Sequence, residues 1–126
     1  MPFVRISVVE GGASRFKAQI SEAVHTALVE KFNVPSDDRF QAISVHGPDE
    51  LIYPPAYLGI VHSKSIVIIQ VTCNAGRTLE LKKALYARIA ELIASTTEVG
   101  KNDVIISLVE VQKEDWSFGN GAASYA

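Results

Sequence analysis

The chain has 126 residues, of which 48% are hydrophobic and 21% are charged. This length and composition are typical of one globular domain, residues 1–126, and the formal net charge of −2 gives no general reason to expect nucleic acid or an anionic membrane as a partner. No signal-like segment opens the sequence and no apolar run approaches the ~20 residues of a membrane span, so we expect a cytoplasmic protein.

A proline directly precedes the first predicted strand, which covers residues 4–8. Because a small second residue generally lets the initiator methionine be removed, we expect Pro2 to carry a free secondary amine. An α-amino group titrates near ~7.7–8.0, and burial or a neighbouring cation lowers its pKa further by disfavouring the charged form. Pro2 is therefore a candidate base at neutral pH; the alternative is that position 2 merely tolerates a proline.

The first helix is predicted over residues 15–32. Gly11 and Gly12 break the preceding strand, and Ser14 is expected to cap the helix. Apolar residues recur at every fourth position and predict one buried face: Phe16, Ile20, Val24, Leu28 and Phe32. The sequence Asn-Val-Pro at 33–35 ends the helix, and a second strand is predicted over residues 40–45.

The second half of the chain, residues 64–126, repeats the order of elements found in residues 2–63. Each half is predicted to contain a strand, a glycine-containing turn, a long amphipathic helix and a second strand. The glycines that end the two first strands, Gly12 and Gly76, are 64 residues apart. The sequence therefore predicts an internal repeat within one domain.

The elements of the second half are predicted as clearly as those of the first. Residues 66–71 form a nearly all-apolar strand, and Thr78 is expected to cap the helix that follows. The apolar face of this helix is predicted to contain Leu81, Leu85, Ile89 and Leu92. A last strand is predicted over residues 104–109.

Two β-α-β units of this kind predict an α+β fold. With right-handed crossovers they pair into one four-stranded sheet that carries both helices on one face. Because the strand at 66–71 is nearly all apolar, we expect the second sheet face to be buried by self-association. A ferredoxin-like fold also places two helices on four strands, and the pattern alone leaves that alternative open.

Several short segments, spread over nearly the whole chain, carry a resemblance to a known family. The sequence resembles the tautomerase superfamily, and within it most closely the malonate semialdehyde decarboxylases. The most specific of the matching segments is Asp-Trp-Ser-Phe-Gly at 115–119. The others are Met1-Pro2, Glu10-Gly11, Val34-Pro35, Asp38-Arg39, Ser44, His46, Pro48, Glu50, Leu58-Gly59, Asp103-Val104-Ile105 and Leu108-Val109-Glu110.

The resemblance implies roles for three catalytic residues. Pro2 corresponds to the catalytic amine, Asp38 to the catalytic aspartate and Arg77 to an arginine that holds the substrate carboxylate. From position alone, Arg77 lies at a predicted helix N-terminus, where backbone N–H groups favour anions, although a solvated turn residue is the alternative. Asp38 is alternatively a turn former, because Asp103 stands 65 residues later at the same place in the repeat.

The resemblance also implies substrate-binding residues. Trp116 corresponds to an aromatic residue of the pocket wall, and Phe118 is expected beside it, so that apolar surroundings keep the proline amine unprotonated. On general grounds a single tryptophan is alternatively core or interface filler. Asn74 is predicted to be a further substrate-binding residue because it is the first residue of the turn that contains Arg77. The sequence departs from the decarboxylases there, since that turn carries one arginine instead of two.

No metal, nucleotide or thiol chemistry is predicted. No two histidines have the spacing of metal ligands beside a carboxylate or thiol. The glycines at 11–12 and 119–121 lack the strand-to-helix spacing of a phosphate-binding loop. Cys73, the single cysteine, lies at the end of an apolar run and is interpreted as a packed thiol.

Together these features predict an enzyme without a cofactor that acts on a small oxo acid and assembles as a homotrimer, as the resemblance implies. The favoured reaction is decarboxylation of a short 3-oxo acid such as malonate semialdehyde, with a possible hydratase side activity. The first alternative is keto-enol tautomerisation of a 2-oxo acid such as phenylpyruvate. The second is a non-enzymatic trimeric binding protein with a vestigial pocket.

Overall fold

The computed structural model describes residues 1–125. Its two long helices are α1 (Lys17–Phe32) and α2 (Leu79–Thr96). The strands are β1 (Phe3–Val9), β2 (Phe40–His46), β3 (Ala56–Tyr57), β4 (Ile60–Val61), β5 (Val67–Asn74) and β6 (Val104–Val111). Short 3-10 turns are η1 (Ala13–Phe16), η2 (Lys101–Asp103) and η3 (Lys113–Asp115).

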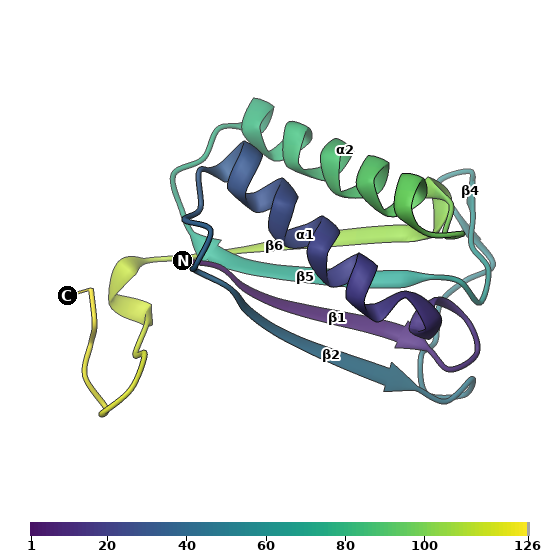
Figure 1. The fold of residues 1–126 in the computed structure, drawn as a ribbon, viewed down its shortest axis with the longest axis horizontal. Coiled ribbons are helices and arrows are strands. Elements are labelled where there is room, and N and C mark those ends of the chain that lie inside the picture. Colours follow the sequence, from purple (N-terminus) through teal and green to yellow (C-terminus); the bar gives the residue numbers. More distant parts are fainter. Residues whose placement is uncertain (126) are drawn as a thin grey trace.

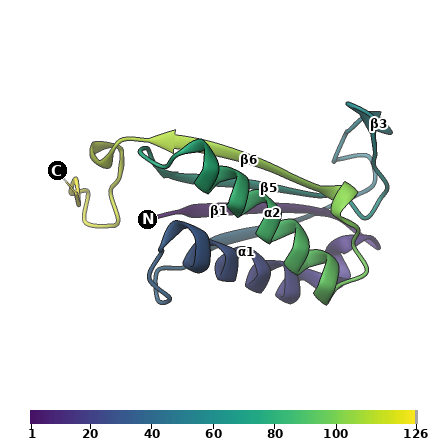
Figure 2. The same ribbon diagram turned by 90° about the horizontal axis from the view of Figure 1, so that it is seen from above.

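The main sheet has the strand order β2-β1-β5-β6 (Figure 1). Strands β1 and β2 are parallel, as are β5 and β6, while the two pairs meet through the antiparallel contact of β1 with β5. Both helices lie on one face of this sheet (Figure 2). The predicted pair of β-α-β units is confirmed. In a ferredoxin-like sheet another strand would separate each parallel pair, so that alternative is excluded.

The core lies between the helices and the sheet. In α1 the buried positions include Ile20, Val24, Leu28 and Phe32, as the four-residue spacing predicted. In α2 the buried face contains Leu85, Ile89 and Ile93. Leu81 is 41% exposed, so the prediction that it belongs to this face was wrong. It lies in the first turn of α2.

The two helices begin differently. The Thr78 hydroxyl accepts a hydrogen bond from the Leu81 N–H at 3.3 Å, which confirms the predicted cap of α2. Ser14 does not cap α1: its hydroxyl accepts from the Gly11 N–H at 3.2 Å, and the turn η1 precedes the α-helix. Serine is used here to stabilise the loop because a side-chain oxygen can serve either purpose.

The face of the sheet away from the helices is less apolar than expected. Arg5 of β1 is in register with Gln70 of β5, which in turn is in register with Ser107 of β6, and all three are exposed. A polar row therefore crosses the middle of this face. Burial of this face by self-association stays a prediction, and a contact there would have to accommodate this polar row.

The strand directions define two ends of the sheet. At the proline end, β1 and β2 begin and β5 and β6 finish, so Pro2, the turn at 74–77 and the segment after β6 lie together (Figure 1). At the hairpin end, the small β3–β4 hairpin follows β2. Among residues 1–125, no helix is long and apolar enough to cross a membrane.

Candidate active site at the proline end

Pro2 is buried at the start of β1, on the wall of a cavity of about 290 Å³. Aromatic side chains form much of this wall. The rings of Trp116 and Phe118 stack at 5.2 Å between centroids with an interplanar angle of 16°, and Phe40 lies 6.0 Å from Phe118. The lining residues are Met1, Pro2, Phe3, Phe40, Trp116, Ser117 and Phe118. The structure thus brings Pro2, Trp116 and Phe118 together.

Asp38 points toward the beginning of the chain. Its Oδ2 atom lies 4.0 Å from the amino group of Met1, and the two side chains are only 16% and 11% exposed. Its Oδ1 atom is buried and has no hydrogen-bond partner among residues 1–125. A buried carboxylate oxygen without a partner is costly. Asp38 is therefore held where it can receive a proton or hydrogen bond from an amine or a bound molecule.

Arg77 is fixed by two backbone carbonyls and an aromatic ring. Its Nη1 atom donates to the Asn74 carbonyl and its Nη2 atom to the Phe32 carbonyl, both at 3.1 Å. Its guanidinium carbon lies 4.6 Å from the centre of the Phe32 ring. Arg77 is half-buried, which argues against a freely solvated turn residue. Because a guanidinium has five N–H donors, these contacts leave donors for a carboxylate.

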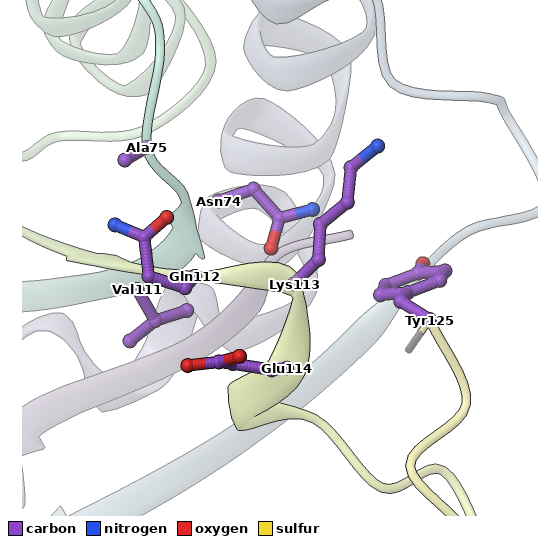
Figure 3. A pocket seen from close by; sticks show the side chains of 7 residues that line it. All are labelled: Asn74, Ala75, Val111, Gln112, Lys113, Glu114 and Tyr125. Carbon is purple, nitrogen blue, oxygen red and sulfur yellow. The ribbon is translucent and has the colours of Figure 1, made fainter.

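Asn74 connects the wall of the proline cavity to a second cavity. Its Oδ1 atom accepts a hydrogen bond from the indole Nε1 of Trp116 at 2.7 Å. The second cavity, of about 480 Å³, adjoins Asn74 where β5 and β6 finish (Figure 3). Its lining residues are Asn74, Ala75, Val111, Gln112, Lys113, Glu114 and Tyr125.

Sequence reasoning missed most of this second lining. Gln112, Lys113 and Glu114 follow β6 directly, and Tyr125 returns from near the end of the chain, its ring 5.3 Å from that of Phe118. Their nearness to the aspartate-tryptophan segment at 115–119 was the one available signal. No spacing rule connects Asn74 with residues that lie about 40 positions further on.

Arg77 is not among the residues that line the proline cavity. Its connection to that cavity runs through Asn74, whose carbonyl accepts from Arg77 and whose side chain accepts from Trp116. The predicted residues Pro2, Trp116 and Phe118 line one cavity, and Asp38 reaches it only through its contact with the amino group of Met1. Arg77 and Asn74 lie beside this cavity at the same end of the sheet. In the single chain, Arg77 and Asn74 are therefore adjacent to the proline cavity but do not line it.

The Arg77 turn is supported by an ion pair between α2 and β6. Lys82 Nζ donates to Glu110 Oε1 at 2.7 Å. This hydrogen bond lowers the pKa of Glu110 and raises the pKa of Lys82, because each charge stabilises the other. The Gly76 N–H also lowers the pKa of Glu110, so the carboxylate is held against the turn that carries Arg77.

Other titratable residues near this end are structural. Burial raises the pKa of the Cys73 thiol, which is 2% exposed, in agreement with a packed thiol. The His25 Nε2 atom lies 2.9 Å from the Ser36 carbonyl, so this ring is used within the fold. Within residues 1–125, no three His, Cys, Asp or Glu side chains are grouped so that they could hold a metal ion.

Two family models, both described as tautomerase enzyme, match residues 2–58 and 38–119. The chain belongs to the tautomerase superfamily. It is 42% identical over 123 residues to the probable tautomerase YusQ of Bacillus subtilis (strain 168), covering 98% of this chain and 97% of that protein. It is 33% identical to the probable tautomerase YrdN of the same organism, covering 99% and 96%.

Solved structures agree with the family. The crystal structure of FG41 malonate semialdehyde decarboxylase inhibited by 3-bromopropiolate is 41% identical with a TM-score of 0.88, and the match covers 98% of this chain and 93% of that one. A second malonate semialdehyde decarboxylase, described with decarboxylase and hydratase activities, is 30% identical with the same TM-score, covering 98% and 95%. The tautomerase protein described here is therefore an enzyme, either a carboxy-lyase or a tautomerase.

Proposed function

We propose that this enzyme decarboxylates a short 3-oxo acid such as malonate semialdehyde, with the amine of Pro2 as the reacting group after removal of Met1. The observation that carries the proposal is the cavity in which Pro2 faces an aromatic wall, with the Asp38 carboxylate beside the amino terminus. Oδ1 of this carboxylate has no hydrogen-bond partner among residues 1–125. The likeness to two malonate semialdehyde decarboxylases supports the choice of reaction. A cavity of about 290 Å³ suits a small acid.

Two routes use the same residues. In the first, the Pro2 nitrogen condenses with the aldehyde and releases water, giving an iminium; the C–C bond electrons then flow into it as carbon dioxide leaves. Protonation of the resulting enamine and hydrolysis release acetaldehyde and the free amine. In the second, protonated Pro2 donates a hydrogen bond to the carbonyl and stabilises the enolate directly. In both, Arg77 orients the carboxylate and Asp38 positions water or transfers the proton.

A tautomerase acting on a 2-oxo acid such as phenylpyruvate is the second candidate. The family description and the curated Bacillus relatives favour it. In that reaction a neutral Pro2 removes a proton next to the carbonyl and returns it elsewhere. A hydratase side activity, such as hydration of an acetylenic acid, is also proposed, because a malonate semialdehyde decarboxylase of the same fold is described with a hydratase activity. The non-enzymatic alternative is not retained, since the family is one of enzymes.

We also propose that the protein assembles as a homotrimer. A fused 4-OT structure described as a symmetric trimer shares the fold with a TM-score of 0.77. Exposed apolar side chains at the hairpin end give this chain a surface for contact with further copies. They include Tyr57, Leu58, Ile60 and Val61, which are 47–83% exposed.

The experiment that tests the main proposal measures acetaldehyde and carbon dioxide released from malonate semialdehyde by the purified enzyme. Intact mass shows whether Met1 has been removed, and labelling with 3-bromopropiolate followed by peptide mass spectrometry locates the reactive amine. We expect one label on Pro2 and strongly reduced turnover in Pro2→Ala. Pro48→Ala, in the loop of the hairpin end, is the matched control, and we expect it to keep the label on Pro2 and the wild-type turnover.

Two results would contradict the proposal. Retention of Met1 in an active preparation would make the Pro2 nitrogen an amide and exclude it as the base. Release of no acetaldehyde, together with ketonisation of phenylenolpyruvate that depends on Pro2, would replace the decarboxylase with the tautomerase.

A further inference from the structure

The contact between Asn74 and Trp116 joins two segments that are 42 positions apart in the sequence. Asn74 is the last residue of β5 and pairs in register with Val111, the last residue of β6. Trp116 follows the short turn η3 and folds back to the end of β5. An indole nitrogen can only donate a hydrogen bond, so the side-chain atom that faces it must be the oxygen of Asn74.

Asn74 also binds the guanidinium of Arg77. The backbone carbonyl of Asn74 accepts from Arg77 Nη1 at 3.1 Å, while its side-chain oxygen accepts from Trp116 Nε1 at 2.7 Å. Trp116 in the wall of the proline cavity and the guanidinium of Arg77 therefore both hydrogen-bond to Asn74. Rotation of the Asn74 side chain would break its hydrogen bond to the indole, whereas Pro2 lies in a different segment, directly before β1.

The other contacts of the indole are apolar or lie within the tail. Trp116 stacks on Phe118, which is 39% exposed and packs in turn on Phe40 of β2 at 6.0 Å between ring centres. The carbonyl of Trp116 accepts from Ser124 at 3.3 Å, which is again a contact within the tail. The hydrogen bond to Asn74 is the polar contact of the Trp116 side chain that reaches the main sheet.

We infer that Asn74 is a positioning residue that acts through Trp116, holding the indole as the wall of the Pro2 cavity, and is not a substrate contact. The inference rests on the proposed function, because it assigns a role within that site, and it revises the substrate-binding role that the resemblance had suggested for Asn74. It explains an amide at this position: a carboxamide supplies the acceptor for the indole without placing a negative charge next to Arg77.

The first test needs no turnover. Trp116 is the only tryptophan of the chain, so its fluorescence reports on this indole alone. We expect Asn74→Leu, which has a similar size but no acceptor, to shift the emission maximum to longer wavelength and to increase quenching by acrylamide. Asn74→Asp keeps an oxygen at the same place and is expected to retain the wild-type spectrum. Identical spectra for the wild type and Asn74→Leu would overturn the inference.

The second test separates positioning from substrate contact by a double-mutant cycle. Asn74→Leu and Trp116→Phe each remove one side of the same hydrogen bond, and each is expected to lower kcat/KM by about 3- to 10-fold. If Asn74 acts through Trp116, the double variant falls no further than the worse single variant. Multiplicative losses would show that Asn74 contacts the substrate independently and would overturn the inference.

The two tests also distinguish this inference from the proposed function. An enzyme with no decarboxylase activity leaves the fluorescence comparison valid, and the cycle can then be run on the rate of Pro2 labelling by 3-bromopropiolate. Should Asn74→Leu fail to fold, as judged by its circular dichroism, Trp116→Phe removes the same hydrogen bond from the other side. A wild-type labelling rate in that variant would count against positioning.

Discussion

The two ends of the sheet contain equivalent positions of the repeat and use them differently. Asp103, at the hairpin end, is 4% exposed, and its two carboxylate oxygens accept from the Ser63 N–H at 2.7 Å and the Ser63 hydroxyl at 2.6 Å. Asp38, at the proline end, has a buried Oδ1 atom with no partner among residues 1–125. One aspartate is fully used by the fold, whereas the other remains available for chemistry.

The glycine turns differ in the same sense. A Cβ atom on Gly12 would lie 2.1 Å from the Lys64 carbonyl oxygen, so that turn is closed by backbone packing, and the next residue, Ala13, is fully buried. Gly76 has a φ of +127° and open space around its Cβ position, and the next residue is Arg77. The Gly12 turn at the hairpin end is thus closely packed against neighbouring backbone, whereas the Gly76 turn at the proline end has free space around it.

The largest expected effect comes from exchanging the two aspartates for asparagine. Asp38→Asn removes a group proposed to transfer or orient a proton, so kcat/KM should fall about 100- to 10,000-fold with little loss of stability. Asp103→Asn places an amide where two donors need a carboxylate, and should destabilise the fold by about 1.5–3 kcal/mol with a much smaller kinetic effect. Steady-state kinetics and urea unfolding of both variants measure this split, and equal behaviour of the two variants would refute it.

Removing the guanidinium at the proline end should have the next largest effect. Arg77→Lys keeps the charge but loses the planar pair of donors, and we expect KM for the oxo acid to rise about 10- to 100-fold, the value of a charge-assisted hydrogen bond. Arg39→Gln is the matched control, because Arg39 is exposed at the same end and pairs with Glu22 at 2.9 Å. An equal rise of KM in the control would mean that general positive charge, and not Arg77, attracts the substrate.

Much of the fold was predictable because it depends on periodic patterns. The four-residue spacing located the buried face of α1, and the offset of 64 between Gly12 and Gly76 revealed the two units. The patterns failed at two positions. Ser14 hydrogen-bonds within its loop instead of capping α1, and Leu81 keeps the spacing of the buried face of α2 but is 41% exposed.

The resemblance proposes the residues of the candidate site but not their arrangement. Pro2, Asp38 and Trp116 were proposed in this way, and the strand directions explain why they lie at one end of the sheet. The hydrogen bond of Trp116 to Asn74 could not be predicted, because a single polar contact between distant segments leaves no periodic signal. For the same reason the two carbonyl partners of Arg77 became visible only in the folded chain.

The two glycine turns should separate stability from substrate binding. Gly12→Ala drives a methyl group into the Lys64 carbonyl, so we expect a loss of about 1–3 kcal/mol of stability and unchanged KM in the folded fraction. Gly76→Ala meets no atom but is strained at a φ of +127°, and should shift the Arg77 turn and raise KM. Thermal unfolding and kinetics decide between these outcomes, and a higher KM for Gly12→Ala than for Gly76→Ala would contradict the comparison.

The smallest expected effect concerns the ion pairs beside the two turns. Lys82 and Glu110 support the Arg77 turn at 2.7 Å, whereas Arg15 and Glu98, at the hairpin end, lie 3.4 Å apart with side chains 58% and 76% exposed. Because the pKa of Glu110 is lowered from 4.5, the stabilisation from its pair is complete above that pH and is lost as the pH falls through the lowered pKa. The pKa of Lys82 is raised from 10.5, so the same stabilisation is also lost in strong alkali, as the pH rises through that raised pKa.

Glu110→Gln should therefore lower the midpoint of thermal unfolding slightly at pH 7, and the difference from the wild type should disappear as the pH falls through the lowered pKa of Glu110. Glu98→Gln removes an exposed pair and should change the midpoint less at any pH, because solvent screens such contacts. Since the Gly76 N–H contributes to the lowered pKa of Glu110, replacement of Glu110 should raise KM by a small factor, while Glu98→Gln leaves KM unchanged. A pH-independent difference for Glu110→Gln would show that its side chain acts there by packing and not by charge.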